Sequence, residues 1–154
     1  MFYRKQYNQA EILKGLQIDE PEIFIPWDIN EDNFVDMFKN HNLARNIERY
    51  CGVKSITVFG EINCNIVAEF DKTIRKFSIS RNYPEGYVFE EDYLIKSFDA
   101  FQTALERQFG KPTNRKKTEI NFESCEWDIG NKIKIYHYVM DRFGLAEYLF
   151  IEKG

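Results

Sequence analysis

The residue whose type is best suited to proton transfer is His137, which lies on a predicted strand close to Asp141 and Glu147. An imidazole next to a carboxylate is the usual arrangement for general acid–base catalysis. On its own strand, however, the histidine alternates with three apolar residues, Ile133, Ile135 and Val139. We therefore expect a core histidine with one ring nitrogen hydrogen-bonded. A catalytic group of His137 with Asp141 or Glu147, beside a pocket, is the alternative.

Cysteine and metal chemistry have little support in the sequence. The three cysteines are an odd number at wide spacings without a CxxC pair, which indicates buried small side chains: Cys51, Cys64 and Cys125. Cys51 is expected at the end of a helix, where the helix dipole disfavours a thiolate. His41 is expected to be exposed or to cap a helix, and the two histidines form no HxH or HExxH motif. We predict neither a metal site nor a bound cofactor.

Carboxylates and tyrosines are the remaining candidates, and they suggest binding rather than catalysis. Catalytic motifs such as GxSxG, GxGxxG and the Walker sequence are absent from the chain. A run of acids around a predicted helix start reads either as a solvated face or as a docking surface for a basic protein: Asp28, Glu31, Asp32 and Asp36. Tyr136 and Tyr138 lie opposite the Ile133 face of their strand. This sheet therefore has apolar side chains on both sides, and a helix, a second subunit or a ligand must cover the tyrosines.

Composition narrows the class of partner. The 154 residues carry 21 basic and 25 acidic side chains, a net charge of −4, which would not attract nucleic acid or anionic lipid. With 44% hydrophobic residues the chain can build a core, and its length is typical of a single domain, residues 1–154. Neither a signal peptide nor an 18-residue apolar stretch is visible, so we expect no membrane contact and a cytoplasmic location.

In the first half, the spacing predicts a short helix over 8–16, an edge strand over 23–27 and a helix from about residue 30 to 51, broken at 40–42. Apolar residues then alternate, which predicts three strands within 53–79, followed by a loop at 81–86. Short connections make these strands antiparallel neighbours.

The second half has the same order of elements. Apolar residues at helical spacing predict a helix over 94–109 that stops at Gly110, and a basic loop over 111–117 follows. A strand over 118–129 with a β-bulge near 123–124 leads to a Gly130-Asn131 hairpin, a strand over 133–139, a turn at 141–144 and a last strand over 145–151. The predicted fold is α+β, with antiparallel sheet built from two halves, each a helix and then a three-stranded meander, and with helices packed on one face.

The helix ending Gln108-Phe109-Gly110-Lys111-Pro112-Thr113, the strand with Trp127 and the hairpin Asp141-Arg142-Phe143-Gly144 give residues 94–152 a weak resemblance to a known group. They resemble small uncharacterised bacterial α+β proteins, some of which are grouped with immunity proteins of polymorphic toxin systems. The resemblance transfers no catalytic role.

The leading hypothesis is a non-enzymatic protein-binding domain, either an immunity protein or a chaperone-like adaptor, that binds a protein partner such as a basic toxin. It would use the acidic residues Asp28, Glu31, Asp32 and Asp36 together with Tyr136 and Tyr138. The alternatives are a small enzyme or ligand-binding domain with a pocket around His137, and a structural homodimer closed through the tyrosine face.

Overall fold

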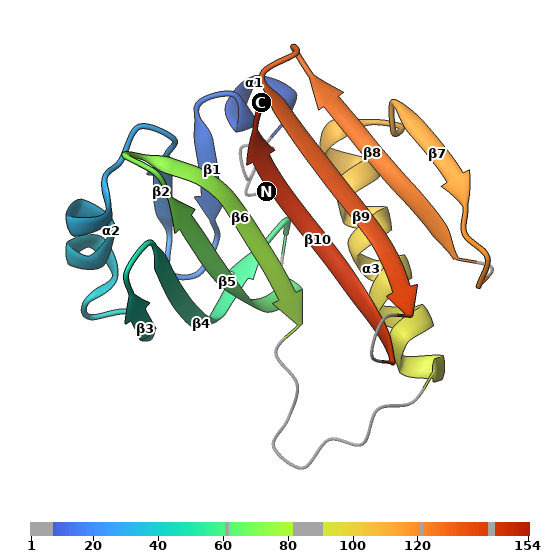
Figure 1. Ribbon diagram of the computed structural model, residues 1–154, viewed down its shortest axis with the longest axis horizontal. Helices are drawn as coiled ribbons and strands as arrows, with labels where there is room; N and C mark the ends of the chain where they lie inside the picture. The colour runs from blue at the N-terminus through green and yellow to red at the C-terminus, as the bar shows by residue number, and fades with distance from the viewer. Residues whose placement is uncertain (1–7, 61, 82–90, 121, 142–143) are drawn as a thin grey trace, which may run out of the picture.

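The computed structural model describes residues 8–60, 62–81, 91–120, 122–141 and 144–154. Its elements, in chain order, are α1 (Gln9–Ile12), β1 (Gly15–Ile18), β2 (Ile23–Pro26), α2 (Glu31–Phe38), β3 (Leu43–Ile47), β4 (Tyr50–Val58), β5 (Ile62–Phe70), β6 (Ile74–Arg81), α3 (Glu91–Phe109), β7 (Asn114–Lys117), β8 (Glu123–Ile129), β9 (Ile133–Asp141) and β10 (Leu145–Lys153) (Figure 1). The predicted α+β class is confirmed.

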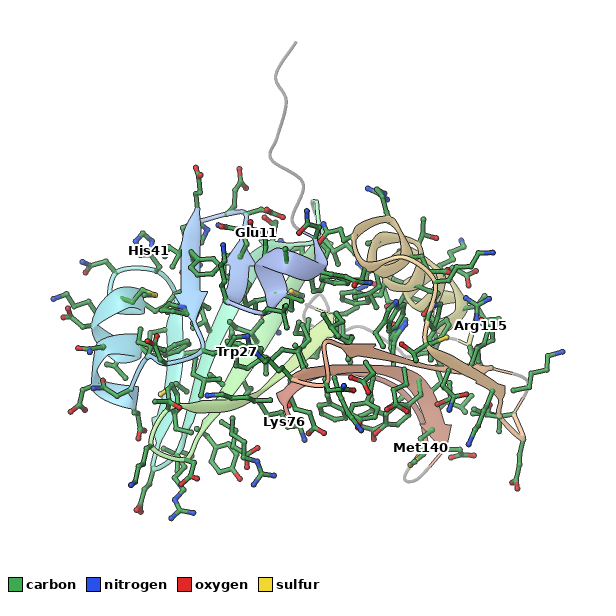
Figure 2. All side chains as sticks on the ribbon, turned by 90° about the horizontal axis from the view of Figure 1, so that it is seen from above. Glu11, Trp27, His41, Lys76, Arg115 and Met140 are labelled. Carbon is green, nitrogen blue, oxygen red and sulfur yellow. The ribbon has the colours of Figure 1, made fainter. Side chains whose placement is uncertain are left out.

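One eight-stranded antiparallel sheet dominates the structure, in the order β3-β4-β5-β6-β10-β9-β8-β7. The two predicted meanders, β4-β5-β6 and β8-β9-β10, are joined side by side where β6 pairs with β10. The short hairpin β1-β2 forms a separate two-stranded sheet. Helices α1 and α3 and this hairpin lie on the same side of the main sheet, which we call its inner face (Figure 2).

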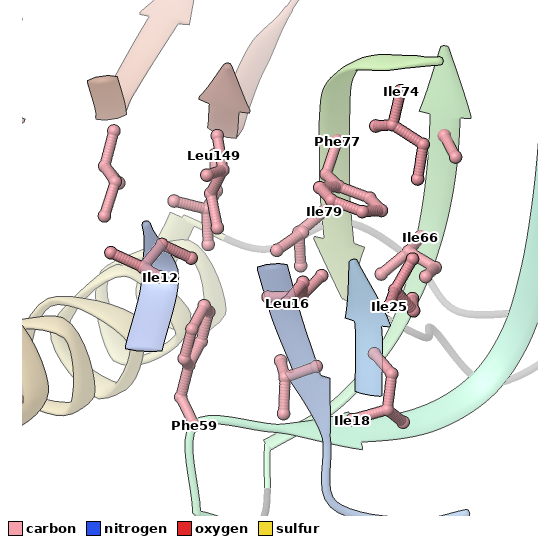
Figure 3. Close-up of a cluster of buried hydrophobic side chains, with 14 of the residues drawn as sticks. Ile12, Leu16, Ile18, Ile25, Phe59, Ile66, Ile74, Phe77, Ile79 and Leu149 are labelled. Atoms are coloured by element: carbon pink, nitrogen blue, oxygen red, sulfur yellow. The ribbon is translucent and has the colours of Figure 1, made fainter. Parts of the chain in front are cut away.

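The core fills the space between the inner face and this covering layer. Side chains from the hairpin, from both meanders and from the helices meet there, including Ile12, Leu16, Ile25, Phe59, Phe77 and Leu149 (Figure 3). Helix α3 contributes the stripe that its spacing predicted, with five buried residues: Leu94, Phe98, Phe101, Leu105 and Phe109. Phe101, Leu105 and Phe109 belong to the main core, which spans both meanders, whereas Leu94 and Phe98 pack with Val139 in a smaller second cluster.

The prediction of a helix over residues 43–51 is wrong, because this segment forms strands. Helix α2 ends at Phe38, and the chain then forms the antiparallel pair β3-β4, which turns at Arg49 with φ 72°. The four-residue spacing of Leu43 and Ile47 imitates a helix, but strand pairing determined the structure. Cys51 consequently lies on β4 rather than at a helix end.

The predicted loop and strand boundaries before β8 are also wrong. Residues 114–117 of the predicted basic loop form the edge strand β7, and β8 begins only at Glu123. The backbone N–H of Thr118 donates to the carbonyl of Phe122 at 2.7 Å, which closes the β7-β8 turn. Pairing runs without interruption through Glu123 and Ser124, so the predicted β-bulge is wrong. The alternation of apolar residues changes phase in this region because residues 118–120 lie outside any strand.

Of the remaining predictions, some agree with the structure and others differ from it by a few residues. Asn8 caps α1 as expected, but Leu16 belongs to β1, since the helix ends at Ile12. Gly130 and Asn131 have φ values of 60° and 55°, which fits the predicted tight hairpin. Residues 82–86 of the predicted loop and 142–143 of the predicted turn lie outside the described residues. No described helix is both long and apolar enough to span a membrane.

Candidate functional site: a buried polar network and an exposed aromatic face

His137 lies in the middle of β9, on the inner face, with none of its surface exposed. The ring of Phe98 stacks on it with centroids 4.1 Å apart and planes 9° apart, and Phe101 contacts its edge at 6.0 Å. Both ring nitrogens have partners: Nδ1 lies 2.9 Å from Oε1 of Gln102, and Nε2 lies 2.5 Å from Oε2 of Glu147. The sequence led us to expect only one bonded nitrogen.

The network continues from Glu147 to Ser97 and Arg81. The hydroxyl of Ser97 donates to Oε1 of Glu147 at 2.5 Å, and Nε of Arg81 donates to the same hydroxyl at 2.8 Å. A longer bond of 3.4 Å runs from Nη2 of Arg81 to the Ser97 carbonyl. The Arg81 guanidinium also lies over the Phe101 ring, 4.6 Å from its centroid. Strands β6, β9 and β10 are thereby tied to α3 through polar side chains.

Whether Nδ1 of His137 donates or accepts a hydrogen bond depends on the orientation of the Gln102 amide. With Oε1 of Gln102 and Oε2 of Glu147 facing the two nitrogens, the doubly protonated ring satisfies both contacts. Nε2 of Gln102 is then buried without a hydrogen-bond partner among the described residues. Rotating the amide by 180° would turn Nε2 toward Nδ1 and would suit the neutral ring instead. The network can therefore satisfy either form of the histidine.

The structure brings His137 and Glu147 together and leaves Asp141 outside the group. Asp141 is exposed at the end of β9, where it pairs with Leu145 across the sheet. The side chain of Glu147 is only 6% exposed, and His137 is completely covered. A general base must reach the proton that it abstracts. This burial argues against the alternative in which His137 acts directly on a substrate.

A cavity of about 190 Å³ adjoins the network where β6 and β10 separate. The two strands pair only from Ile79 opposite Leu149 to Lys76 opposite Glu152. Continuing this register would place Arg81 opposite Glu147, but the strands diverge before that point (Figure 1). Arg81 and Glu147 both line the cavity, and Ser97 of α3 bridges them.

The outer face of β9 and β10 carries an aromatic cluster that no described element covers. Tyr138 stacks with Tyr148 at 5.3 Å between centroids, and Phe150 lies 6.2 Å from Tyr138 and 6.0 Å from Tyr148. Nζ of Lys76 lies 4.1 Å from the Phe150 centroid. Figure 2 shows Lys76 and Met140 on the side of the sheet away from α3. We call Tyr136, Tyr138, Tyr148 and Phe150 the aromatic face; each of them is half-buried.

A row of charged side chains crosses the same outer face. Register partners from β8 to β5 alternate in sign along this row: Asp128, Lys134, Glu152, Lys76 and Glu69. Burial and the nearby Glu152 raise the pKa of the Tyr136 hydroxyl, although Lys134 opposes this effect. Opposite charges on neighbouring strands favour this pairing over a shifted one.

The acidic residues proposed as a docking surface lie elsewhere. Asp28, Asp32 and Asp36 are exposed, but they lie on or next to α2, at the opposite end of the molecule from β9 in both Figure 1 and Figure 2. Glu31 is half-buried, and its Oε1 lies 3.9 Å from Sγ of Cys51. The acids and the tyrosines therefore do not form a single surface.

Thiol and metal chemistry find no site among the described residues. All three cysteines are buried and lie outside any disulfide. Burial raises the pKa of Cys64 to about 12, and burial together with Glu31 raises that of Cys51 to about 11. Burial also raises the pKa of Cys125, which Arg115 partly counteracts. No group of three or more potential metal ligands occurs in the described parts of the chain, and His41 is exposed.

No protein-family model, curated protein or solved structure matches this chain. The resemblance of residues 94–152 to immunity proteins therefore gains no support from relatives. Any function has to rest on the buried network, the cavity and the aromatic face.

Proposed function

We propose that this chain is a non-enzymatic protein-binding domain, of the immunity-protein or adaptor type, and that the aromatic face is its docking surface. The observation that carries the proposal is the cluster of Tyr138, Tyr148 and Phe150 on a side of the sheet that no described element covers. Tyrosine and other aromatic side chains are enriched in protein interfaces, because they combine a large contact area with few rotatable bonds.

Charge on this face favours a basic partner. The aromatic face is bordered on its own and neighbouring strands by three acids and two lysines: Glu126, Asp128, Glu152, Lys76 and Lys134. The acidic excess has the same sign as the net charge of −4. Such a face attracts a positively charged protein and selects its orientation. A basic toxin with an apolar patch between its cationic residues has this chemistry.

The burial of His137 supports a binding role over an enzymatic one. Its nitrogens are occupied by Gln102 and Glu147, and its ring is covered by Phe98. Buried networks of this kind fix the position of the elements that they join. Here they hold α3 against β9 and β10, so that the opposite side of these strands is presented as a rigid surface. A cytoplasmic location is part of the proposal, since a reducing compartment keeps three cysteines outside any disulfide in the thiol form.

The test is co-expression with the product of each gene next to the one for this chain. Under the proposal, one of these products is toxic alone, and growth is restored when the chain is co-expressed. The double variant Tyr138→Ala, Tyr148→Ala should lose rescue and weaken binding by at least about thirtyfold, since interface hot spots contribute about 2 kcal/mol or more. Tyr50→Ala is the matched control, because Tyr50 is 47% exposed on β4, which β5 and β6 separate from β10.

Two outcomes would overturn the proposal. One is rescue or binding that the double variant leaves unchanged, because the aromatic face would then not be the docking surface. The other is a concentration-dependent dimer, seen by light scattering of the isolated chain, that the double variant abolishes. In that case a second copy would cover the face, as in the structural-homodimer alternative.

A further inference from the structure

The opening between β6 and β10 produces an unusual pair of strand ends. Ser80 and Arg81 remain paired with β5, and Glu147 remains paired with β9, but the two strands no longer pair with each other. Backbone groups on the facing edges are therefore left without the ladder that they would otherwise form. The cavity of about 190 Å³ lies at this opening.

The wall of the cavity combines apolar residues with two charged ones. Ile79, Phe101 and Leu145 supply apolar surface, whereas Arg81 and Glu147 supply charge. Both oxygens of Glu147 already accept short hydrogen bonds, from Ser97 and His137. Among the described residues, Arg81 uses Nε for Ser97, and its Nη2 makes a long bond of 3.4 Å to the Ser97 carbonyl. The hydrogen-bonding capacity that remains on this wall is therefore mainly that of a cationic donor.

We propose that this cavity binds a small organic carboxylate, with the guanidinium of Arg81 holding the carboxylate and Ile79, Phe101 and Leu145 enclosing a compact apolar body. Within the described residues, no carboxylate lies within ion-pair distance of Arg81. A planar guanidinium donates two parallel hydrogen bonds to a carboxylate, which is a strong and specific pairing. Stacking on Phe101 and bonding to Ser97 fix the guanidinium before a ligand arrives.

The volume limits the size of the ligand. An engineered protein cavity of about 150 Å³ binds benzene, so about 190 Å³ accommodates one ring together with a carboxylate. Drug-sized ligands need pockets of about 300 Å³ or more. Benzoate is therefore a suitable probe, and benzamide and benzylamine are its neutral and cationic counterparts of nearly the same shape. This inference is independent of the partner that the aromatic face binds.

The experiment is a titration of the ¹⁵N-labelled chain with each probe, followed by two-dimensional NMR. Benzoate should cause saturable shifts of the amides of Ser80, Arg81, Ala146 and Glu147, whereas amides of α2 should stay in place. Benzamide and benzylamine should bind at least about tenfold more weakly, because neither offers a charged acceptor to the guanidinium.

Two variants test separately whether binding depends on the Arg81 cation and on the volume of the cavity. Arg81→Met keeps a long side chain over Phe101 but removes the cation, and it should weaken benzoate binding at least about tenfold. Ala146→Leu leaves Arg81 unchanged and fills part of the cavity, and it should also weaken binding. Arg75→Met, at an exposed position of the same strand, should bind benzoate like the unmodified chain.

The proposal is overturned if benzoate causes no saturable shift at concentrations up to about 10 mM. A ligand with a dissociation constant of about 1 mM would occupy most of the sites at that concentration. The proposal is equally overturned if the shifts map away from the β6-β10 opening, or if benzamide or benzylamine binds as well as benzoate. These readouts use the unmodified chain, so they decide the question even if Arg81→Met fails to fold.

Discussion

Glu147 accepts hydrogen bonds from Ser97 and His137 at 2.5 Å each, with only 6% of its side chain exposed. Charged acceptors make stronger hydrogen bonds than neutral ones, and a buried donor left without a partner is costly. At the scale of single residues, this carboxylate is therefore where the structure is most sensitive to a change of charge.

Glu147→Gln is expected to lower the free energy of unfolding by about 2–4 kcal/mol, because the amide cannot accept from both Ser97 and His137 as strongly as the carboxylate does. Urea denaturation measures this change. Glu48→Gln, at an exposed position, should change stability by less than about 0.5 kcal/mol. Equal effects of the two substitutions would mean that the buried network does not stabilise the fold.

The buried thiols predict a loss of stability at alkaline pH. In the unfolded chain a thiol ionises near its ordinary pKa of 9.0, whereas folding raises the pKa of Cys64 to about 12. Between these values the native state binds more protons than the unfolded state, so stability falls as the pH rises above 9. Cys51, with a pKa of about 11, acts in the same direction.

Comparing the unmodified chain with Cys64→Ala isolates this contribution. The variant is expected to lose less stability between pH 8 and pH 10.5, although it starts from a lower value because of the cavity that it creates. Urea denaturation at both pH values gives the difference. If the two chains lose stability in parallel, then Cys64 is not shielded as the structure indicates.

Sequence alone predicts that His137, Cys64 and Cys125 are buried, because each alternates with apolar residues along a predicted strand. Cys51 is buried as predicted, but on a strand rather than at a helix end. The sequence does not identify Arg81, Ser97 or Gln102 as members of the network. Ser97 and Gln102 flank the apolar stripe of α3, where either a buried or an exposed position fits the periodicity. Which polar groups meet depends on how α3 is docked, and local spacing contains no information about that.

The row of alternating charges is a property of paired strands. Lys134, Glu152 and Lys76 are neighbours only because β9, β10 and β6 pair in this register. A slip of one residue would move the aromatic face to the inner side and would break the row at the same time. The row and the aromatic cluster therefore favour the same register.

Glu152→Lys should lower the free energy of unfolding by about 1 kcal/mol, since it places three lysines side by side. Added salt should reduce this loss, because the charges lie near solvent and are screened. Glu22→Lys makes the same change of charge at an exposed position outside the row and should have little effect. A loss that does not depend on salt would show that repulsion is not its cause.

The meanders and α3 could be predicted because their hydrophobic periods are long and regular. The strands β3 and β7 could not. Residues 43–51 contain apolar spacings that suit either a helix or a hairpin, and β7 consists of four polar, exposed residues without alternation. Strand β7 forms because β8 offers it an edge, and its basic residues are typical of an edge strand that resists further pairing.

At the scale of the whole molecule, one core extends across both meanders. The same buried cluster contains Trp27, Phe77, Trp127 and Leu149, which belong to the covering layer and to both halves of the sheet. Trp27 donates from Nε1 to the Ile12 carbonyl at 2.7 Å. Trp127 donates to the Gly110 carbonyl at 2.8 Å. Such a shared core should unfold as one cooperative unit.

Single-tryptophan variants test this expectation. Trp27→Phe leaves Trp127 as the only tryptophan, and Trp127→Phe leaves Trp27, because the chain has two. In each variant, the urea midpoint from fluorescence should coincide with that from far-ultraviolet circular dichroism. A fluorescence transition that precedes the loss of secondary structure in either variant would mean that the two meanders unfold separately.

The position of β10 in the sheet affects how the chain folds during its synthesis. Strand β10 follows both β6 and β9 in the chain, yet it lies between them in the sheet and is their shared partner. While the ribosome has not yet released residues 145–153, the meander β4-β5-β6 exposes the edge of β6 and β9 exposes one of its edges. Unpaired edges of this kind recruit other strands. The nascent chain should therefore be most prone to aggregation until residues 145–153 have emerged, because β10 then pairs with both earlier edges at once.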